Sequence, residues 1–273
     1  MMKRILIILI AVGWMAMAGI PAWAVSTEGS EKVLTAASKR DIDISLFYKG
    51  DRVYFFGVNP VAGSDLVVRL TAEKAEEIKL SMKGKVGPFW MTVKQYEVTH
   101  APFIYKIHAS KPLEQIISED QAKELGLGYD AVKSKMKMHL VRGDAAPEDG
   151  EELFKGLLKI KQDANLYRIV EDDPQSTKEA PRLEITEGKL FKHYFTFPPA
   201  ATEGKYQVES FSFQNGEMVG YGKDVIEIRK VGLEGWITHA SQEYAVFYGI
   251  GAVLIALGAG LLVGMIFKKG GHH

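Results

Sequence analysis

The sequence contains no cysteine among its 273 residues. Disulfide bonds, thiolate metal sites, cysteine nucleophiles and haem attachment through cysteine are therefore excluded. A lipid anchor on a cysteine is excluded for the same reason. A chain of this length buries enough apolar surface to fold without disulfides, so a stable exported domain remains possible.

An excess of charge is also missing, because 34 basic residues balance 34 acidic residues. The segments assigned below to a signal peptide and to a membrane anchor with its tail hold four basic residues and no acidic residue. The exported part therefore carries a net charge of −4. A mildly acidic domain argues against nucleic acid or anionic lipid as its main ligand.

Motifs of the common enzyme classes are absent too. The chain has no G-x-S-x-G, no Walker loop, no dinucleotide fingerprint and no HExxH. Each of these motifs supplies a nucleophile, a phosphate cradle or a metal that the chemistry needs. We therefore expect a protein that is not an enzyme, with no catalytic residues and no cofactor.

Three groupings resemble metal ligands and are interpreted as ordinary structural or surface residues. They are Met136-x-Met138-His139, the pairs Asp41/Asp43 and Asp172/Asp173, and the terminal His272-His273. The first could suit Cu(I), but interleaved lysines oppose a cation. Two carboxylates are fewer than the ligands Ca²⁺ takes, so we expect no resident metal.

The N-terminus has the three parts of a secretory signal peptide over residues 1–24. Lys3 and Arg4 precede an apolar run from Ile5 to Ala18, and Ala22-Trp23-Ala24 is a small-x-small cleavage site. An uncleaved signal anchor is the alternative. Both readings export the residues that follow.

The C-terminus contains a long run without charge. Residues 244–267 read YAVFYGIGAVLIALGAGLLVGMIF, and Lys268 and Lys269 follow in the tail 268–273. A helix of this length covers roughly 36 Å, enough to cross a hydrocarbon core of about 30 Å. The lysines place the tail in the cytoplasm. These features predict a single span through the lipid bilayer, in a bacterial inner membrane, with the preceding domain in the periplasm.

One face of this helix carries small residues at a spacing of four. They are Ala252, Ala256, Gly260 and Gly264. Small side chains let another helix backbone approach closely, so the face predicts helix packing with a membrane partner or with a second copy. The alternative is that small residues are simply common in membrane spans.

The exported region reads as strands, then helices, then strands. Strand-like segments such as Arg52 to Val58 recur with turn signals every eight to twelve residues, a spacing that is typical of a β-sandwich. Asn215-Gly216 predicts a two-residue hairpin, and Tyr206 resembles the tyrosine that ties a corner in Ig-like folds. The fold class is mainly β, with an Ig-like β-sandwich, a helical insertion and one C-terminal transmembrane helix. The predicted divisions are an N-terminal segment 25–39, the sandwich 40–231 with its insertion at about 112–171, and a juxtamembrane link 232–243.

Helix signals mark the insertion. Ser118 with Gln121 forms a capping box, and an apolar stripe predicts a helix from Glu151 to about Arg168. Two separate domains are the alternative to one interrupted sandwich.

Trp90 follows Gly87-Pro88 and Phe89. We interpret it as a core residue, with a pocket or a binding interface as the alternative.

Several blocks resemble the uncharacterised "putative transmembrane protein" family described mainly from alphaproteobacteria. The blocks are KGKVGPFW at 83–90, ASKPLE at 109–114, LYR at 166–168, GKYQV at 204–208 and RKVGLE at 229–234. The resemblance runs over most of residues 40–267 and carries no established site. It implies a multispanning partner, because members are often encoded beside permeases resembling sulfite/organosulfonate exporters.

Together these observations favour a membrane-anchored accessory or interaction subunit of such an anion exporter. A membrane-tethered periplasmic solute-binding or sensing module is the alternative. A deep polar pocket would favour the alternative, and a partner that co-purifies would favour the first hypothesis.

Overall fold

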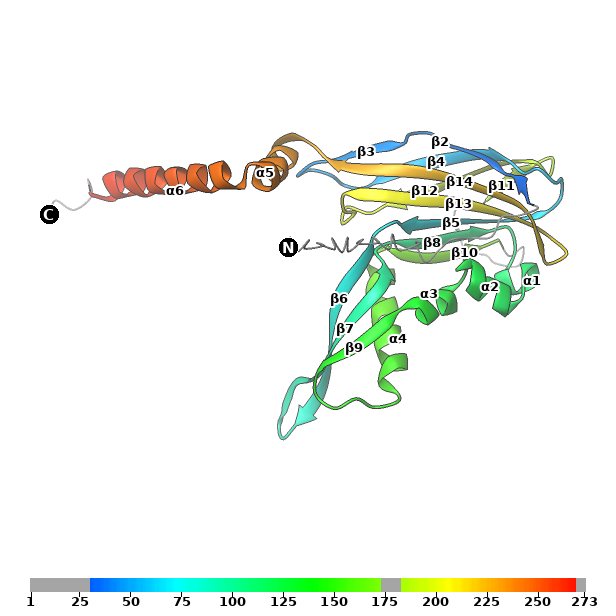
Figure 1. The fold of residues 1–273 in the computed structure, drawn as a ribbon, viewed down its shortest axis with the longest axis horizontal. Helices are drawn as coiled ribbons and strands as arrows, with labels where there is room; N and C mark the ends of the chain where they lie inside the picture. The colour runs from blue at the N-terminus through cyan, green and yellow to red at the C-terminus, as the bar shows by residue number, and fades with distance from the viewer. Residues whose placement is uncertain (1–29, 173–182, 269–273) are drawn as a thin grey trace, which may run out of the picture.

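The computed structural model describes residues 30–172 and 183–268 (Figure 1). The predicted signal peptide, Asp173, Lys269 and the terminal histidines lie outside these residues. The described chain is mainly β, with three sheets and one long C-terminal helix. The prediction of a mainly β protein with one membrane-length helix at its C-terminus is confirmed. The Ig-like assignment stays a prediction.

The largest sheet has seven strands and is called sheet A. Its order is β1-β14-β13-β5-β8-β10, and β3 also pairs with β14. Its strands are β1 (Glu31–Lys32), β3 (Asp41–Ile44), β5 (Asp65–Ala72), β8 (Tyr105–Ala109), β10 (Tyr167–Glu171), β13 (Gly204–Gln214) and β14 (Glu217–Lys230). The sheet is mixed, because β1 and β3 run parallel to β14 and β10 runs parallel to β8.

Sheet B has four strands and packs face to face on sheet A. Its order is β11 (Glu184–Thr186), β12 (Leu190–Phe197), β4 (Asp51–Val58) and β2 (Leu34–Ala37). Ring contacts join the two sheets, with centroids 4.7 Å apart for His108 and Phe195 and 5.5 Å apart for Phe197 and Tyr206. The apolar residues that alternate along β4 and β12 therefore form a core between the layers.

Two local predictions in sheet A are confirmed. Asn215 and Gly216 join β13 to β14 with φ values of 52° and 83°, as a tight hairpin turn requires. The Tyr206 hydroxyl donates to the Thr202 carbonyl oxygen at 2.7 Å, which is the expected corner contact.

A third sheet projects away from the two-layer body (Figure 1). It contains β6 (Ala75–Val86), β7 (Phe89–Pro102) and β9 (Lys137–Arg142), and α4 (Asp149–Asp163) packs against it. We call this unit the arm. The ladder between β6 and β7 is irregular near Glu76, and His100 has a φ of 64°. These irregularities mark the bend at which the arm leaves the body.

The helices at the other end of the insertion cover sheet A. They are α1 (Leu113–Ile116), α2 (Glu119–Leu125) and α3 (Tyr129–Lys135). The predicted capping box of Ser118 and Gln121 opens α2. Buried Arg69 on β5 holds this region in place by donating to the Leu125 and Gly126 carbonyl oxygens at 2.5 and 2.9 Å.

The insertion departs from the sequence prediction at its end. Helix α4 ends at Asp163 rather than near Arg168, because Asn165 takes a φ of 54° and Arg168 already belongs to strand β10. Segment 112–171 therefore contains two strands besides its helices. One of them, β10, completes the edge of sheet A.

Candidate functional site

The C-terminal helix α6 (Ala245–Lys268) has the composition of a membrane span. Its stretch Ala245–Met265 has a mean hydropathy of 2.3 and is not covered by any other described part of the chain. Large side chains such as Leu254 and Leu261 are 63% and 70% exposed. Apolar surface on this scale is stable in hydrocarbon and not in water, so α6 is the candidate membrane anchor.

The predicted small-residue face of α6 divides into two parts. Ala252 and Ala256 line an apolar groove of about 640 Å³ between α6 and α5 (Gly232–Glu243). Gly260 and Gly264 lie further along the span, where a Cβ atom built on either glycine meets no atom within 4 Å. The structure therefore leaves this half of the face open for close approach by another backbone.

The predicted juxtamembrane link 232–243 is the helix α5. The Val231 amide donates to the Ile44 carbonyl oxygen at 2.9 Å, which fixes the start of α5 to the end of β3. Tyr244 separates α5 from α6 with a φ of −121°. Trp236, on α5, is 65% exposed and lines the groove with Tyr244. Such rings suit the head-group depth of a bilayer.

A second exposed apolar feature lies beside α5. Because Ile44 pairs with Lys230, the loop after β3 emerges at the end of sheet A from which β14 leads into α5. This loop carries Leu46 and Phe47, whose exposed fractions are 69% and 86%. The end of the body nearest the anchor therefore exposes two large apolar side chains.

Trp90 is not a core residue, and the interpretation that favoured the core is wrong. It lies at the tip of the arm with 72% of its surface exposed, beside Phe89 at 69%. The tip extends beyond the reach of α4 and both large sheets, so nothing in the described chain packs over it (Figure 1). The alternative of an interface aromatic is the one that this position favours.

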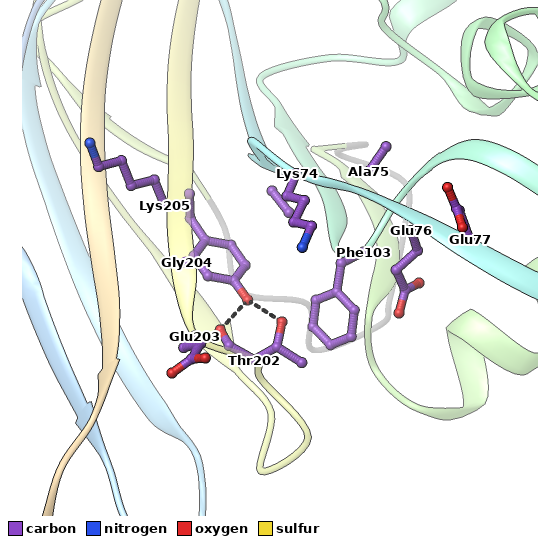
Figure 2. Close-up of a pocket in the computed structure, with 11 residues that line it drawn as sticks. Lys74, Ala75, Glu76, Glu77, Phe103, Thr202, Glu203, Gly204 and Lys205 are labelled. Atoms are coloured by element: carbon purple, nitrogen blue, oxygen red, sulfur yellow. Dashed lines mark hydrogen bonds between the residues drawn. The ribbon is translucent and has the colours of Figure 1, made fainter. Parts of the chain in front are cut away.

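A cleft of about 500 Å³ lies at the base of the arm (Figure 2). Figure 2 shows Lys74, Phe103 and Thr202 around its opening, while the ends of Glu77 and Lys205 point away from it. The Glu76 carboxylate on the lining is bound by Lys161. The lining mixes acidic and basic groups, so its charges select no single sign of ligand.

A second group of titratable side chains is buried between sheets A and B. Burial lowers the pKa of His108 to about 4, with a smaller contribution from Arg168, and lowers that of His193 well below its ordinary value. Burial also lowers the pKa of Lys106 to about 8, and its ammonium donates to the Thr196 carbonyl oxygen at 2.6 Å. All three side chains are at most 5% exposed, so no substrate reaches them in this conformation.

The residues of the metal-like groupings are dispersed. Met136 is buried at the end of α3, while His139 is exposed on β9 opposite Glu97. Asp41 is paired with Arg229 at 2.9 Å. Within residues 30–172 and 183–268, no three His, Asp or Glu side chains are grouped as ligands for a metal ion.

Sequence reasoning missed the arm as a separate feature. Strand β9 lies in segment 112–171, for which the sequence predicts a helical insertion. Strands β6 and β7 do lie in the region predicted as strands, but their lengths of 12 and 14 residues are well above the usual five or six, as a projecting hairpin requires.

Comparison with known proteins identifies one family. No curated protein matches the chain. The model of the family described as "putative transmembrane protein" matches residues 32–269, which include α5, α6 and the three sheets except for Glu31. This match covers most of the sequence. The chain therefore belongs to this putative transmembrane protein family.

Proposed function

We propose that the protein is a non-enzymatic accessory subunit, held in the membrane by α6, that associates with a multispanning partner. The observation that carries the proposal is the α5–α6 groove together with the open glycine face that continues it along α6. Groove and face offer one continuous path for a neighbouring helix. The partner we favour is an anion exporter of the sulfite/organosulfonate type, which the family resemblance implies.

The shape of the groove supports a helix as its occupant. Its lining combines the small residues Ala252 and Ala256 with larger side chains of α5 and of the first turns of α6, including Trp236 and Phe247. Association of helices in a bilayer depends on close packing, because lipid tails compete equally for apolar contact. Small residues beside bulky ones on an apolar lining suit such packing.

Photo-crosslinking in native membranes tests the association. A benzophenone amino acid at Ala252 or Ala256 should give a protein adduct that mass spectrometry identifies as a multispanning protein. The same group at Leu254, which lies on another face of α6, is the matched control. Equal adducts from both faces, or adducts with lipid alone, would overturn the proposal.

A solute-binding module is the second candidate, and the cleft at the base of the arm is the observation that favours it. Native mass spectrometry of the full chain, extracted in mild detergent, would detect a retained small molecule. Loss of that molecule in a Thr202→Trp variant would place it in the cleft. A ligand-free spectrum from freshly extracted protein would count against this candidate.

A further inference from the structure

The tip of the arm has an unusual surface for a protein with an acidic exported domain. Val86, Phe89, Trp90 and Met91 are 50%, 69%, 72% and 50% exposed. Successive residues of a strand point to opposite faces, so Trp90 lies on one face of the hairpin while Phe89 and Met91 lie on the other. The tip is therefore an apolar wedge, exposed on both sides.

The charges that the hairpin itself carries next to this wedge all have one sign. Between Glu77 and Glu97 the hairpin contains four lysines and no acidic residue. Lys79, Lys83 and Lys85 are exposed and alternate along one face of β6, with Lys85 directly opposite Trp90. The fourth, Lys94, is bound to Asp149. Although the domain is acidic overall, this end of the hairpin is therefore basic and apolar.

The arm begins at the same end of the body as the membrane anchor. Ala72, three residues before β6, pairs with Tyr206, which pairs with Ile226 near the end of β14. From there β6 extends roughly 40 Å at about 3.3 Å per residue. Figure 1 shows the tip at the level of α5 along the axis of α6, on the side of the body that faces the anchor.

The arm is braced, so the tip is held in this position. Asp149 at the start of α4 binds Lys94 and Tyr96 on β7. Near the other end of α4, buried Lys161 binds Glu76 on β6 and donates to the Phe103 carbonyl oxygen at 3.2 Å. Both ends of the helix are thus fastened to the long hairpin.

We propose that the arm tip inserts into the head-group region of the membrane that α6 spans, and that it recognises anionic lipid. Aromatic rings sit favourably at the interface, and lysines beside them attract anionic head groups. A flat protein surface would cover one face of the wedge, whereas a fluid interface covers both. The domain is then held to the bilayer at two separated points, which fixes its tilt relative to α6.

The absence of cysteine makes a site-specific test direct. Met91→Cys in the full chain takes one environment-sensitive fluorophore, and Gln214→Cys, exposed at the opposite end of sheet A, is the matched control. Both proteins are reconstituted in phosphatidylcholine vesicles with and without phosphatidylglycerol. Bromine-labelled acyl chains should quench the probe at 91 in the anionic vesicles and leave the probe at 214 unchanged.

Charge variants separate recognition from chance proximity. Lys83→Gln with Lys85→Gln should reduce the ratio of inserted to free tip roughly thirtyfold, because each lysine near an anionic surface contributes on the order of a fivefold factor. Lys189→Gln with Lys223→Gln removes the same charge elsewhere and should have little effect. These substitutions are at exposed positions, so folding is preserved.

Two outcomes would overturn the proposal. One is a probe at 91 that is as accessible to water as the probe at 214 in anionic vesicles. The other is a change at 91 that follows protein density and ignores the lipid quencher, which would indicate a second copy as the occupant. The vesicles contain no exporter, so either result leaves the accessory function of α6 untouched.

Discussion

The Lys94 ammonium lies 2.8 and 2.9 Å from the two carboxylate oxygens of Asp149. The Tyr96 hydroxyl donates to the same carboxylate, and so does the Ala146 amide. This carboxylate therefore joins the first turn of α4 to the middle of β7. The arm depends on it because α4 is the layer that covers one face of the small third sheet.

Asp149→Asn should loosen the arm without unfolding the body. Its donors lower the pKa of the Asp149 carboxyl to about 2. The carboxylate is ionised in both folded and unfolded chains at neutral pH, so its stabilisation is complete above about pH 4 and is lost as the pH falls toward 2. Hydrogen exchange should show faster exchange in β7 and α4 for the variant at neutral pH. Asp163→Asn, at an exposed position of the same helix, is the control, and equal exchange in both variants would contradict the role of Asp149.

Arg69 and Glu209 form an ion pair that is 0% and 2% exposed on their side chains, with 2.5 Å between nitrogen and oxygen. Arg69→Met should lower the free energy of unfolding by about 3–5 kcal/mol, because it leaves a buried carboxylate without its cation. Adding Glu209→Leu should recover part of that loss. Denaturant titration measures both, and a double variant as unstable as the single one would show that the contacts of Arg69 to α2 dominate.

The sequence predicts those parts of the fold that depend on neighbouring residues. Three such features are found where the sequence predicts them: the turn at Asn215-Gly216, the capping box at Ser118 and the corner at Tyr206. Each depends only on conformations or hydrogen bonds between residues close together in the chain. Trp90 shows the limit, because burial depends on what lies beside a residue in space. A tryptophan after a turn has the same local pattern in a core and at an exposed tip.

Long-range pairing explains the other differences. Strand β10 follows the apolar stripe of α4 closely, so the helical periodicity predicts a helix that continues to Arg168. In the structure, pairing with β8 makes the residues of β10 a strand instead. Arg69 lies in the apolar run DLVVRLTA. Nothing in that run indicates that the carboxylate of Glu209, far along the chain, pairs with the buried guanidinium. The open half of the small-residue face could be located only once α5 was placed against α6.

The two buried histidines predict loss of stability in mild acid. Burial holds the pKa of His108 near 4, well below its ordinary value, so the unfolded chain binds protons more readily between about pH 6.5 and 4. The free energy of unfolding should therefore fall across that range, by about 3 kcal/mol for His108 alone. His193→Phe should be neutral or stabilising, because both of its ring nitrogens lack hydrogen-bond partners among the described residues. A flat wild-type profile would contradict the prediction.

The orientation of the span is tested by reporter fusions. The two lysines that follow Phe267 predict a cytoplasmic C-terminus, with the β domain on the opposite side. A reporter that is active only in the cytoplasm should be active when fused after Phe267 and silent when fused after Gly150. The reverse pattern would require the domain to lie in the cytoplasm.

Gly260→Ile with Gly264→Ile tests whether the open face of α6 binds another helix. Bulky side chains there would hold a neighbouring backbone away and remove the contacts that close approach provides. Helix pairs in bilayers depend on contacts worth about 1–2 kcal/mol, so crosslinking to the partner or to a second copy should fall roughly tenfold. Insertion and domain folding should be unaffected, because isoleucine suits hydrocarbon and a Cβ at either glycine meets no atom within 4 Å beyond its chain neighbours and the nearby helix backbone. Leu254→Ile with Leu262→Ile changes two exposed side chains away from the face of Gly260 and Gly264 and should change crosslinking little. Equal crosslinking in both double variants would mean that α6 serves as a tether and that recognition resides in the β domain.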